Sequence, residues 1–292
     1  MLIGSYISAP VYMIISGLGF SLMGLCVKIA GARGFPVMEL IFARSLVSLI
    51  LCYIDIHRLR LSISGRSTGL LWLRGIIGFL ALIAVYKSLT ILPLAEATLI
   101  QYLHPIFTAI FAWFFLGERI RNNTILCVFF GCLGTLILSS PGIIKDDASL
   151  SLIGLAVGLV GAAGSGLAYT LVRHLSYSEH PSVIILYFPL VCFPLSLIFG
   201  WNDFIMPRDS DWLLLIAIGF FTHIGQVGLT LGMSLEKAAN VAAYGYVQVV
   251  FAAMLGFFVL GEHLSMTTLL GTICILGGLV MNYRQGGFKK FH

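Results

Sequence analysis

Polar side chains that could bind a small molecule recur at helical spacing in two otherwise apolar segments. Gln101, His104 and Thr108 follow i, i+3, i+7 spacing and share one helix face, while Tyr244 and Gln248 are i, i+4 neighbours in the second segment. Amide, imidazole and hydroxyl groups in an apolar medium can exchange hydrogen bonds with a polar ligand, and burying them there is costly. We expect these side chains to line a central cavity; the alternative is that they hydrogen-bond between helices as packing contacts.

A third polar face carries His223, Gln226 and Thr230, again at helical spacing. An internal repeat, described below, places its first and last members over Phe79 and Tyr86. The two equivalent faces are then polar and aromatic, which suits an amphipathic metabolite; an interior helix contact is the alternative. A histidine on either polar face could titrate near neutral pH and couple to protons, or could simply be a satisfied hydrogen-bond partner.

Few charged residues lie inside the apolar segments. Glu39 and Arg44 are expected to form a structural ion pair, with contact between Arg44 and an anionic substrate group as the alternative. Arg74 lies near the predicted inner end of its segment, from which its long side chain can reach the membrane surface. Glu118 and Glu262 end their segments and are interpreted as elements of topology and packing, not as ligands.

Motifs typical of enzymes and ATP-driven pumps are missing from the sequence. No lysine directly follows a glycine, so the phosphate-binding pattern GxxxxGK[ST] is absent, and HExxH does not occur. The six cysteines form no CxxC pair and are interpreted as small packing residues. We therefore expect no catalytic residue, no metal site and no cofactor.

The composition indicates what kind of element must position these side chains. The chain of 292 residues is 59% hydrophobic and 10% charged, with a mean hydropathy of +1.02, against about 45–50% and about 25% for soluble domains. This excludes a water-soluble globule and a disordered chain, and the apolar runs are too long for a transmembrane β-barrel. The sequence predicts an all-α polytopic membrane protein with ten transmembrane helices. These are expected near Pro10–Ala32, Val37–Ile56, Thr68–Leu92, Ala95–Leu116, Thr124–Ile144, Ser149–Arg173, Pro181–Gly200, Asp211–Glu236, Ala238–Leu260 and Ser265–Tyr283.

Lysine and arginine in the loops predict the orientation. With a cytoplasmic N-terminus, the inner loops carry ten of these residues and the outer loops carry three. Both termini are therefore predicted to be cytoplasmic, and the net charge of +5 is mainly a topology signal rather than a nucleic-acid footprint. No basic region precedes Pro10, so the first helix is expected to be retained. The inner group is Arg58, Arg60, Arg66, Arg119, Arg121, Arg173, Lys237, Arg284, Lys289 and Lys290; the outer group is Arg33, Lys145 and Arg208.

An internal repeat spans half of the chain. Ala95–Glu118 aligns with Ala239–Glu262 at an offset of 144 residues, with eight of 24 positions identical, and His104 and Gln248 become equivalent. Each half holds five predicted helices, an odd number, so the second copy is expected to lie inverted in the membrane. Residues 1–147 and 148–292 are thus predicted to be two inverted five-helix repeats, an arrangement typical of secondary transporters with a site near the midplane.

Several short motifs carry a family resemblance over essentially the whole chain. They are Glu39 with Arg44, Arg74-Gly75, the run from Leu92-Pro93-Leu94-Ala95 through His104-Pro105 to Leu116-Gly117-Glu118, and its echo Leu260-Gly261-Glu262. With the repeat, they resemble the EamA-type ten-helix members of the drug/metabolite transporter superfamily. One position departs from that pattern: Val249 stands opposite Pro105, where relatives often keep proline in both halves, so a mirror-image movement of these two helices is left open.

The resemblance implies a secondary carrier of a small organic metabolite that works by alternating access. An amino acid or an amino-acid-derived compound is the expected substrate. The alternatives are an exporter of varied amphipathic compounds or, from a different class, a membrane channel or scaffold. The expected partners are a small-molecule substrate and the lipid bilayer, without nucleic acid, and a homodimer is left open. The resemblance also implies a bacterial inner (cell) membrane.

Overall fold

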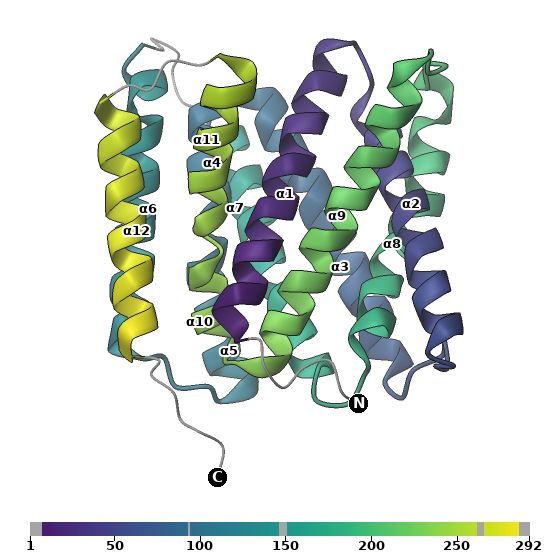
Figure 1. Ribbon diagram of the computed structural model, residues 1–292, viewed down its shortest axis with the longest axis horizontal. Helices are drawn as coiled ribbons and strands as arrows, with labels where there is room; N and C mark the ends of the chain where they lie inside the picture. The colour runs from purple at the N-terminus through teal and green to yellow at the C-terminus, as the bar shows by residue number, and fades with distance from the viewer. Residues whose placement is uncertain (1–7, 93, 146–150, 262–265, 286–292) are drawn as a thin grey trace.

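The computed structural model describes residues 8–92, 94–145, 151–261 and 266–285 (Figure 1). Within these ranges the chain forms α-helices and one 3-10 turn, without strands. The elements are α1 (Ala9–Ala32), α2 (Val37–Arg58), α3 (Thr68–Ile91), α4 (Leu94–Gln101), α5 (His104–Leu116), α6 (Asn122–Lys145), α7 (Leu152–Leu175), α8 (Pro181–Gly200), η1 (Trp201–Asp203), α9 (Ser210–Leu235), α10 (Ala238–Tyr244), α11 (Val247–Leu260) and α12 (Met266–Gln285).

The helices have the length and composition of membrane spans. Nine stretches of the described residues are long and apolar enough to cross a membrane, and Asn122–Ile137 is a shorter apolar helix. The stretches Ala97–Leu116 and Ala238–Val259 each comprise two consecutive helices, α4 with α5 and α10 with α11. The predicted all-α polytopic membrane protein is confirmed.

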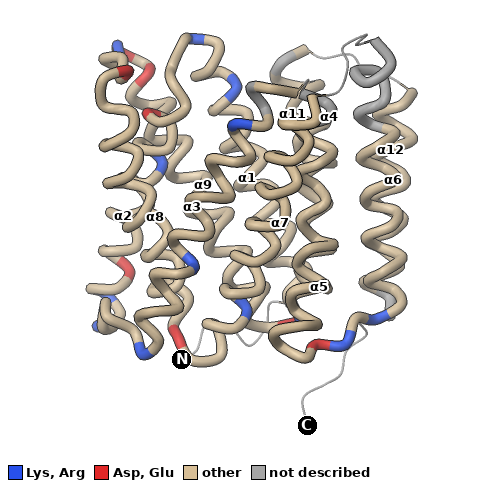
Figure 2. The backbone as a smooth tube through the Cα atoms, turned by 180° about the vertical axis from the view of Figure 1, so that it is seen from behind, with Lys and Arg blue, Asp and Glu red and all other residues tan. Residues whose placement is uncertain are grey.

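Most charged residues lie toward the two ends of the bundle, and a few lie inside it (Figure 2). The loops joining α2 to α3, α5 to α6, α7 to α8 and α9 to α10 lie at the end where α1 begins (Figure 1). These loops, with the helix ends beside them, carry the described members of the inner group of lysines and arginines. One end of the bundle is therefore more basic, and its assignment as the cytoplasmic end stays a prediction.

The largest helix contacts join a helix of the first half of the chain to a helix of the second half. α1 packs along α9 and α3 along α7, while α2 packs on α8 and α6 on α12. With the repeat offset, α1 corresponds to α7 and α3 to α9, so the first two contacts are equivalent to each other. Each of the other two contacts joins a helix to its own equivalent. A two-fold relation between the halves would produce this pattern. The two inverted repeats, and their boundary between residues 147 and 148, which lies outside the described residues, stay a prediction.

The fourth and ninth expected helices are both interrupted, although we predicted them to be continuous. α4 ends at Gln101 and α5 begins at His104; α10 ends at Tyr244 and α11 begins at Val247. At both breaks the backbone bonds tighten to i→i−3, as from Leu103 N–H to the Ile100 carbonyl (3.0 Å) and, in the second half, from Tyr246 N–H to the Ala243 carbonyl (3.4 Å). Such tight turns inside a helix often mark a hinge.

Proline alone does not explain these breaks. Pro105 has no N–H to bond to the preceding turn, which accounts for the first break. In the second half, Val249 occupies the position equivalent to Pro105. The helix is nevertheless interrupted there, next to Gly245. Both halves therefore contain an interrupted helix at the equivalent position, whereas a mirror-image movement of these helices stays a prediction.

Candidate functional site

Two equivalent tyrosines meet where the interrupted helices approach each other. The rings of Tyr102 and Tyr246 stack with centroids 6.2 Å apart and an interplanar angle of 26°. The Tyr246 hydroxyl donates to the Tyr102 carbonyl at 2.9 Å, across 144 residues. It also lies 3.0 Å from the Cys132 sulfur. Equivalent residues can touch only close to a two-fold axis, so we expect both helix breaks to lie next to the predicted axis between the halves.

Polar atoms without partners lie next to the first break. The His104 side chain is buried, its Nδ1 has no hydrogen-bond partner, and its ring packs edge-on against Tyr169 with centroids 5.1 Å apart. The Gln101 Nε2 group donates to the Ser165 hydroxyl at 3.5 Å, whereas its buried Oε1 has no partner. Tyr169 and Ser165 come from α7, so this part of the site joins the two halves.

Arg74 lies inside the bundle instead of reaching the surface as expected. Its side chain is buried, and one terminal nitrogen, NH2, donates to the Gln226 Oε1 atom at 3.2 Å. The Nε and NH1 donors of Arg74 have no hydrogen-bond partner. The guanidinium carbon lies 4.7 Å from the centre of the Phe188 ring. Contacts from α8 and α9 enclose this side chain, which sequence spacing alone does not reveal.

Arg44 approaches the same aromatic ring, and its expected pairing with Glu39 is not formed. Its guanidinium carbon lies 5.4 Å from the Phe188 ring centre, and the side chain is buried. The Glu39 carboxylate instead accepts a hydrogen bond from the Ile205 N–H at 2.8 Å. A five-residue separation turns two side chains by about 140° around a helix, so they point to different faces.

The two guanidinium groups form a cationic centre that has no counter-charge among the described residues. The guanidinium carbons of Arg74 and Arg44 lie 4.7 Å and 5.4 Å from the centre of the same Phe188 ring. In the described part of the chain, no carboxylate lies within 4.0 Å of either group; the ion pairs there involve other residues. A charged side chain buried within a membrane helix is costly. We call Arg44 and Arg74 the arginine pair.

Glycines on α3 allow α8 to approach the arginine pair. A Cβ atom on Gly75 would lie 2.6 Å from the Tyr187 carbonyl oxygen. One on Gly78 would lie 2.9 Å from the Phe188 ring. These close contacts explain the Arg74-Gly75 motif, since the missing side chains place the Phe188 ring over the guanidinium groups.

Together these side chains form the central polar cluster. Its members come from α2, α3, α5, α7 and α9 and from the end of α4, and Phe188 of α8 lies beside them. They are Arg44, Arg74, Gln101, His104, Tyr169 and Gln226. The sequence predicted a site role for Gln101, His104 and Gln226, which stays a prediction. Tyr169 and Phe188 were missed, because a lone aromatic residue in an apolar helix looks like a core residue.

Other predicted site residues have contacts that suit packing. Thr108 is fully buried, and its hydroxyl donates to the His104 carbonyl one turn earlier at 2.9 Å. Phe79 is buried in an apolar cluster that also includes Phe188, and Tyr86 packs against that cluster. The Thr108 hydrogen bond matches the packing alternative for that residue. Phe79 and Tyr86 lie in the same apolar cluster as Phe188, the ring that the arginine pair contacts.

The remaining predicted residues lie along α9, α10 and α11. The His223 Nδ1 atom is 3.9 Å from the Cys52 sulfur. Thr230 is fully buried, and its hydroxyl has no hydrogen-bond partner. Tyr244 is buried, and Gln248 is half-buried beside the second break. Their role in substrate binding stays a prediction.

A buried ion pair joins four helices at the more basic end. The Glu118 Oε1 atom lies 2.9 Å from the Arg173 Nε atom, and Glu118 Oε2 accepts the Ala238 N–H at 2.8 Å at the start of α10. Arg173 also donates to the carbonyl oxygens of Met233 (2.7 Å) and Ser234 (3.3 Å) at the end of α9. These contacts fit the expected packing role of Glu118, whereas Glu262 lies outside the described residues.

The cluster offers hydrogen-bonding and cationic groups rather than metal ligands. Within the described ranges, no group of three or more histidine, cysteine, aspartate or glutamate side chains could hold a metal ion. The six cysteines are free thiols. The chemistry available at the centre is therefore reversible binding of polar and anionic groups.

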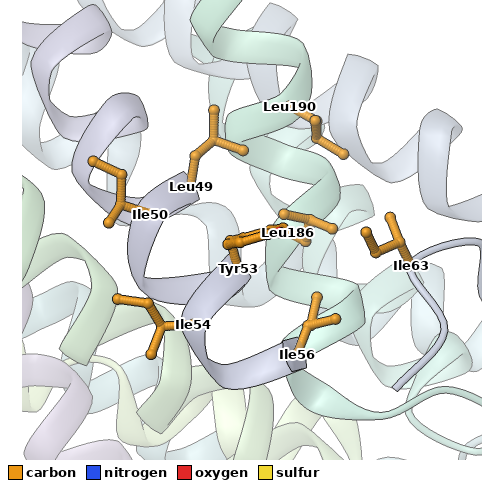
Figure 3. A pocket seen from close by; sticks show the side chains of 8 residues that line it. All are labelled: Leu49, Ile50, Tyr53, Ile54, Ile56, Ile63, Leu186 and Leu190. Carbon is orange, nitrogen blue, oxygen red and sulfur yellow. The ribbon is translucent and has the colours of Figure 1, made fainter. Parts of the chain in front are cut away.

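An apolar groove of about 340 Å³ opens between α2 and α8 (Figure 3). It contains no charged side chain, and several of its aliphatic residues are exposed on the outside of the bundle. Such a surface suits contact with lipid tails and differs in chemistry from the central polar cluster. Its lining residues are Leu49, Ile50, Tyr53, Ile54, Ile56, Ile63, Leu186 and Leu190.

Comparisons with known proteins agree with this architecture. The sequence profile of the EamA-like transporter family matches residues 7–140 and 152–284. The chain is 31% identical to the pseudopaline exporter CntI of Pseudomonas aeruginosa, over 92% of this chain and 93% of that protein. It is 26% identical to mouse solute carrier family 35 member G1, over 94% of this chain and 79% of that protein. A protein of known crystal structure, 20% identical, has the same fold with a TM-score of 0.83, covering 96% of this chain and 99% of that one.

Proposed function

The chain belongs to the EamA-like transporter family, and from this premise we propose that it exports a small organic metabolite by alternating access. It is a transporter and not an enzyme. The proposed substrate is an amino acid or an amino-acid-derived compound. The proposed direction draws support from the CntI relative, which is an exporter. We propose a bacterial inner membrane as the location, with both termini in the cytoplasm.

The central polar cluster is the observation that carries this function. It brings together polar side chains from both halves of the chain, several with buried donors or acceptors that have no partner. Such groups are costly in a membrane, so their presence indicates a functional site. Interrupted helices lie beside the cluster, an arrangement that secondary transporters use at their substrate sites.

The geometry suggests how the two sides could open in turn. The helix breaks at Tyr102–Leu103 and Gly245–Tyr246 are places where each half can bend. The Glu118–Arg173 pair ties together α5, α7, α9 and α10 at the more basic end, so breaking it would let that end open. In this mechanism the cluster binds the substrate, and rocking of the halves changes the side from which it is reached.

Transport by purified protein in liposomes tests the proposal. Metabolite profiling of cells with and without the protein first identifies compounds whose export depends on it. A labelled compound from that set should then show saturable uptake and counterflow in proteoliposomes. Linear flux that does not saturate would instead indicate a channel, and the absence of flux for every such compound would indicate a scaffold.

A further inference from the structure

We propose that the arginine pair binds the carboxylate groups of the transported compound and that this compound carries two negative charges. This assignment deepens the proposed function and rests on it, because it names the substrate class for the same central site. Carboxylate oxygens are strong acceptors for guanidinium donors. Two cations that have no ionic partner among the described residues are balanced by two negative charges, which makes a dicarboxylate the best match.

The free donors of Arg74 are the first observation behind this assignment. Its Nε and NH1 groups are buried without a partner, and the one acceptor it contacts, the Gln226 amide oxygen, is neutral. A guanidinium stays charged in proteins, so the cost of burying it cannot be relieved by losing a proton. An anion arriving at these donors would supply both the missing hydrogen bonds and the missing charge.

Arg173 shows how the same chain treats an arginine with a structural role. Its side chain is almost as well buried, yet it pairs with Glu118 at 2.9 Å and donates to the carbonyl oxygens of Met233 and Ser234. Arg44 and Arg74 have no such partners in the described part of the chain and share only the face of Phe188. The contrast points to a ligand as the partner that completes the arginine pair.

The arginine pair is also placed for transport. Arg44 lies about 10 Å along α2 from its start, and Arg74 lies about 9 Å along α3 from its start. These two helices begin at opposite ends of the bundle (Figure 1). Their charges therefore converge on the interior from opposite sides, while Gln226 and Phe188 add contacts from the second half. A dicarboxylate held here would touch both halves and could respond to their movement.

Thermal unfolding of the purified full-length protein tests the assignment without requiring transport. The probes are glutarate, citrate, inorganic phosphate and the neutral diamide glutaramide, compared at equal ionic strength. A ligand that binds the folded state raises its unfolding temperature. Glutarate or citrate should raise the wild-type value in a saturable way, with no shift from glutaramide and a smaller shift from phosphate.

Charge-removing variants complete the test. Arg44→Gln and Arg74→Gln should each weaken the carboxylate effect at least tenfold, while their unfolding temperature without probe stays equal or rises. Arg121→Gln is the control, because it removes a positive charge at the end of the bundle, where Arg121 faces Glu236 at 3.9 Å. It should keep the full carboxylate effect. Loss of stability in both arginine-pair variants without probe would indicate a structural role and overturn the proposal.

Other outcomes also overturn it and are separable from failure of the proposed function. An equal shift by glutaramide, a larger shift by phosphate, no shift by either carboxylate, or a shift that persists in both variants would remove the carboxylate assignment. Saturable counterflow of a neutral metabolite, unchanged in Arg74→Gln, would remove it while leaving the transporter function intact. Carboxylate binding without saturable flux would overturn the transporter proposal alone.

Discussion

The Tyr246 hydroxyl donates a 2.9 Å hydrogen bond to the carbonyl oxygen of Tyr102, its equivalent in the other half of the chain. Both residues lie at helix breaks, and their rings stack. The contact therefore joins the two helix breaks directly, one from each half of the chain. When one half moves against the other, Tyr102 and Tyr246 must either move together or lose their hydrogen bond.

Tyr246→Phe should destabilise the protein by about 1–3 kcal/mol, because it removes the buried donor to the Tyr102 carbonyl while keeping the stacked ring. The measurement is unfolding of the purified protein by heat or denaturant. Tyr244→Phe is the matched control, since Tyr244 is also buried in the same region but its hydroxyl makes no hydrogen bond within the described residues. Equal losses of stability in the two variants would show that the hydrogen bond between Tyr246 and Tyr102 does not contribute to stability.

Gly131→Ala should destabilise the protein by about 1–3 kcal/mol, the usual cost of overpacking. A Cβ atom at Gly131 would overlap the ring of Tyr246, which is itself fully buried. Gly24→Ala on α1 is the control, because a Cβ atom there would meet nothing within 4 Å. Unfolding temperatures of the two variants give the comparison, and a harmless Gly131→Ala would mean that the ring can move aside freely.

The membrane fold could be predicted from the sequence because bilayer thickness dictates the length of each apolar run. The expected range for α8 matches the observed helix, and those for α1 and α2 each differ from the observed helix at one end only. The break at Gly245 was not predicted, since no proline marks it. Hydrophobicity alone treats α10 and α11 as one span.

The central site was predictable in residue type but not in partners. His104 and Gln101 stand out because polar groups are rare in these helices. The partner of Arg44 could not be read from nearby sequence, since Glu39 points to another face and the contact that forms is with Phe188, far along the chain. The arginine pair therefore depends on packing between residues far apart in the sequence, and no local sequence pattern predicts it.

Breaking the Glu118–Arg173 pair should cost about 3–5 kcal/mol of stability, because the remaining partner is left buried and charged. Glu118→Gln and Arg173→Gln should therefore each unfold more easily than the wild type. The double variant should lose less than the sum of the single effects, as a double-mutant cycle measures for residues in contact. Strict additivity would show that the two side chains do not interact energetically.

Single cysteines should reveal the orientation of the bundle. In a cysteine-free background, Arg60→Cys places a thiol in the exposed loop after α2, and Asp203→Cys places one in the exposed turn after α8 at the other end. The excess of basic residues predicts that the Arg60 end is cytoplasmic. A membrane-impermeant maleimide should label Asp203→Cys in intact cells and Arg60→Cys only after permeabilisation; the reverse result would invert the topology.

His104→Ala and Gln248→Ala should each raise the substrate concentration needed for half-maximal transport by about threefold or more, with the yield of folded protein nearly unchanged. The reason is that these equivalent residues flank the two helix breaks, and the buried His104 Nδ1 has no protein partner whose loss would destabilise the fold. Saturable counterflow in proteoliposomes provides the measurement. Thr108→Val is the matched control on the His104 face, because the Thr108 hydroxyl already donates to its own helix. Transport by His104→Ala and Gln248→Ala that cannot be distinguished from Thr108→Val would mean that the helix breaks do not contribute to substrate binding, and it would restrict the candidate site to the arginine pair and its neighbours on α8 and α9.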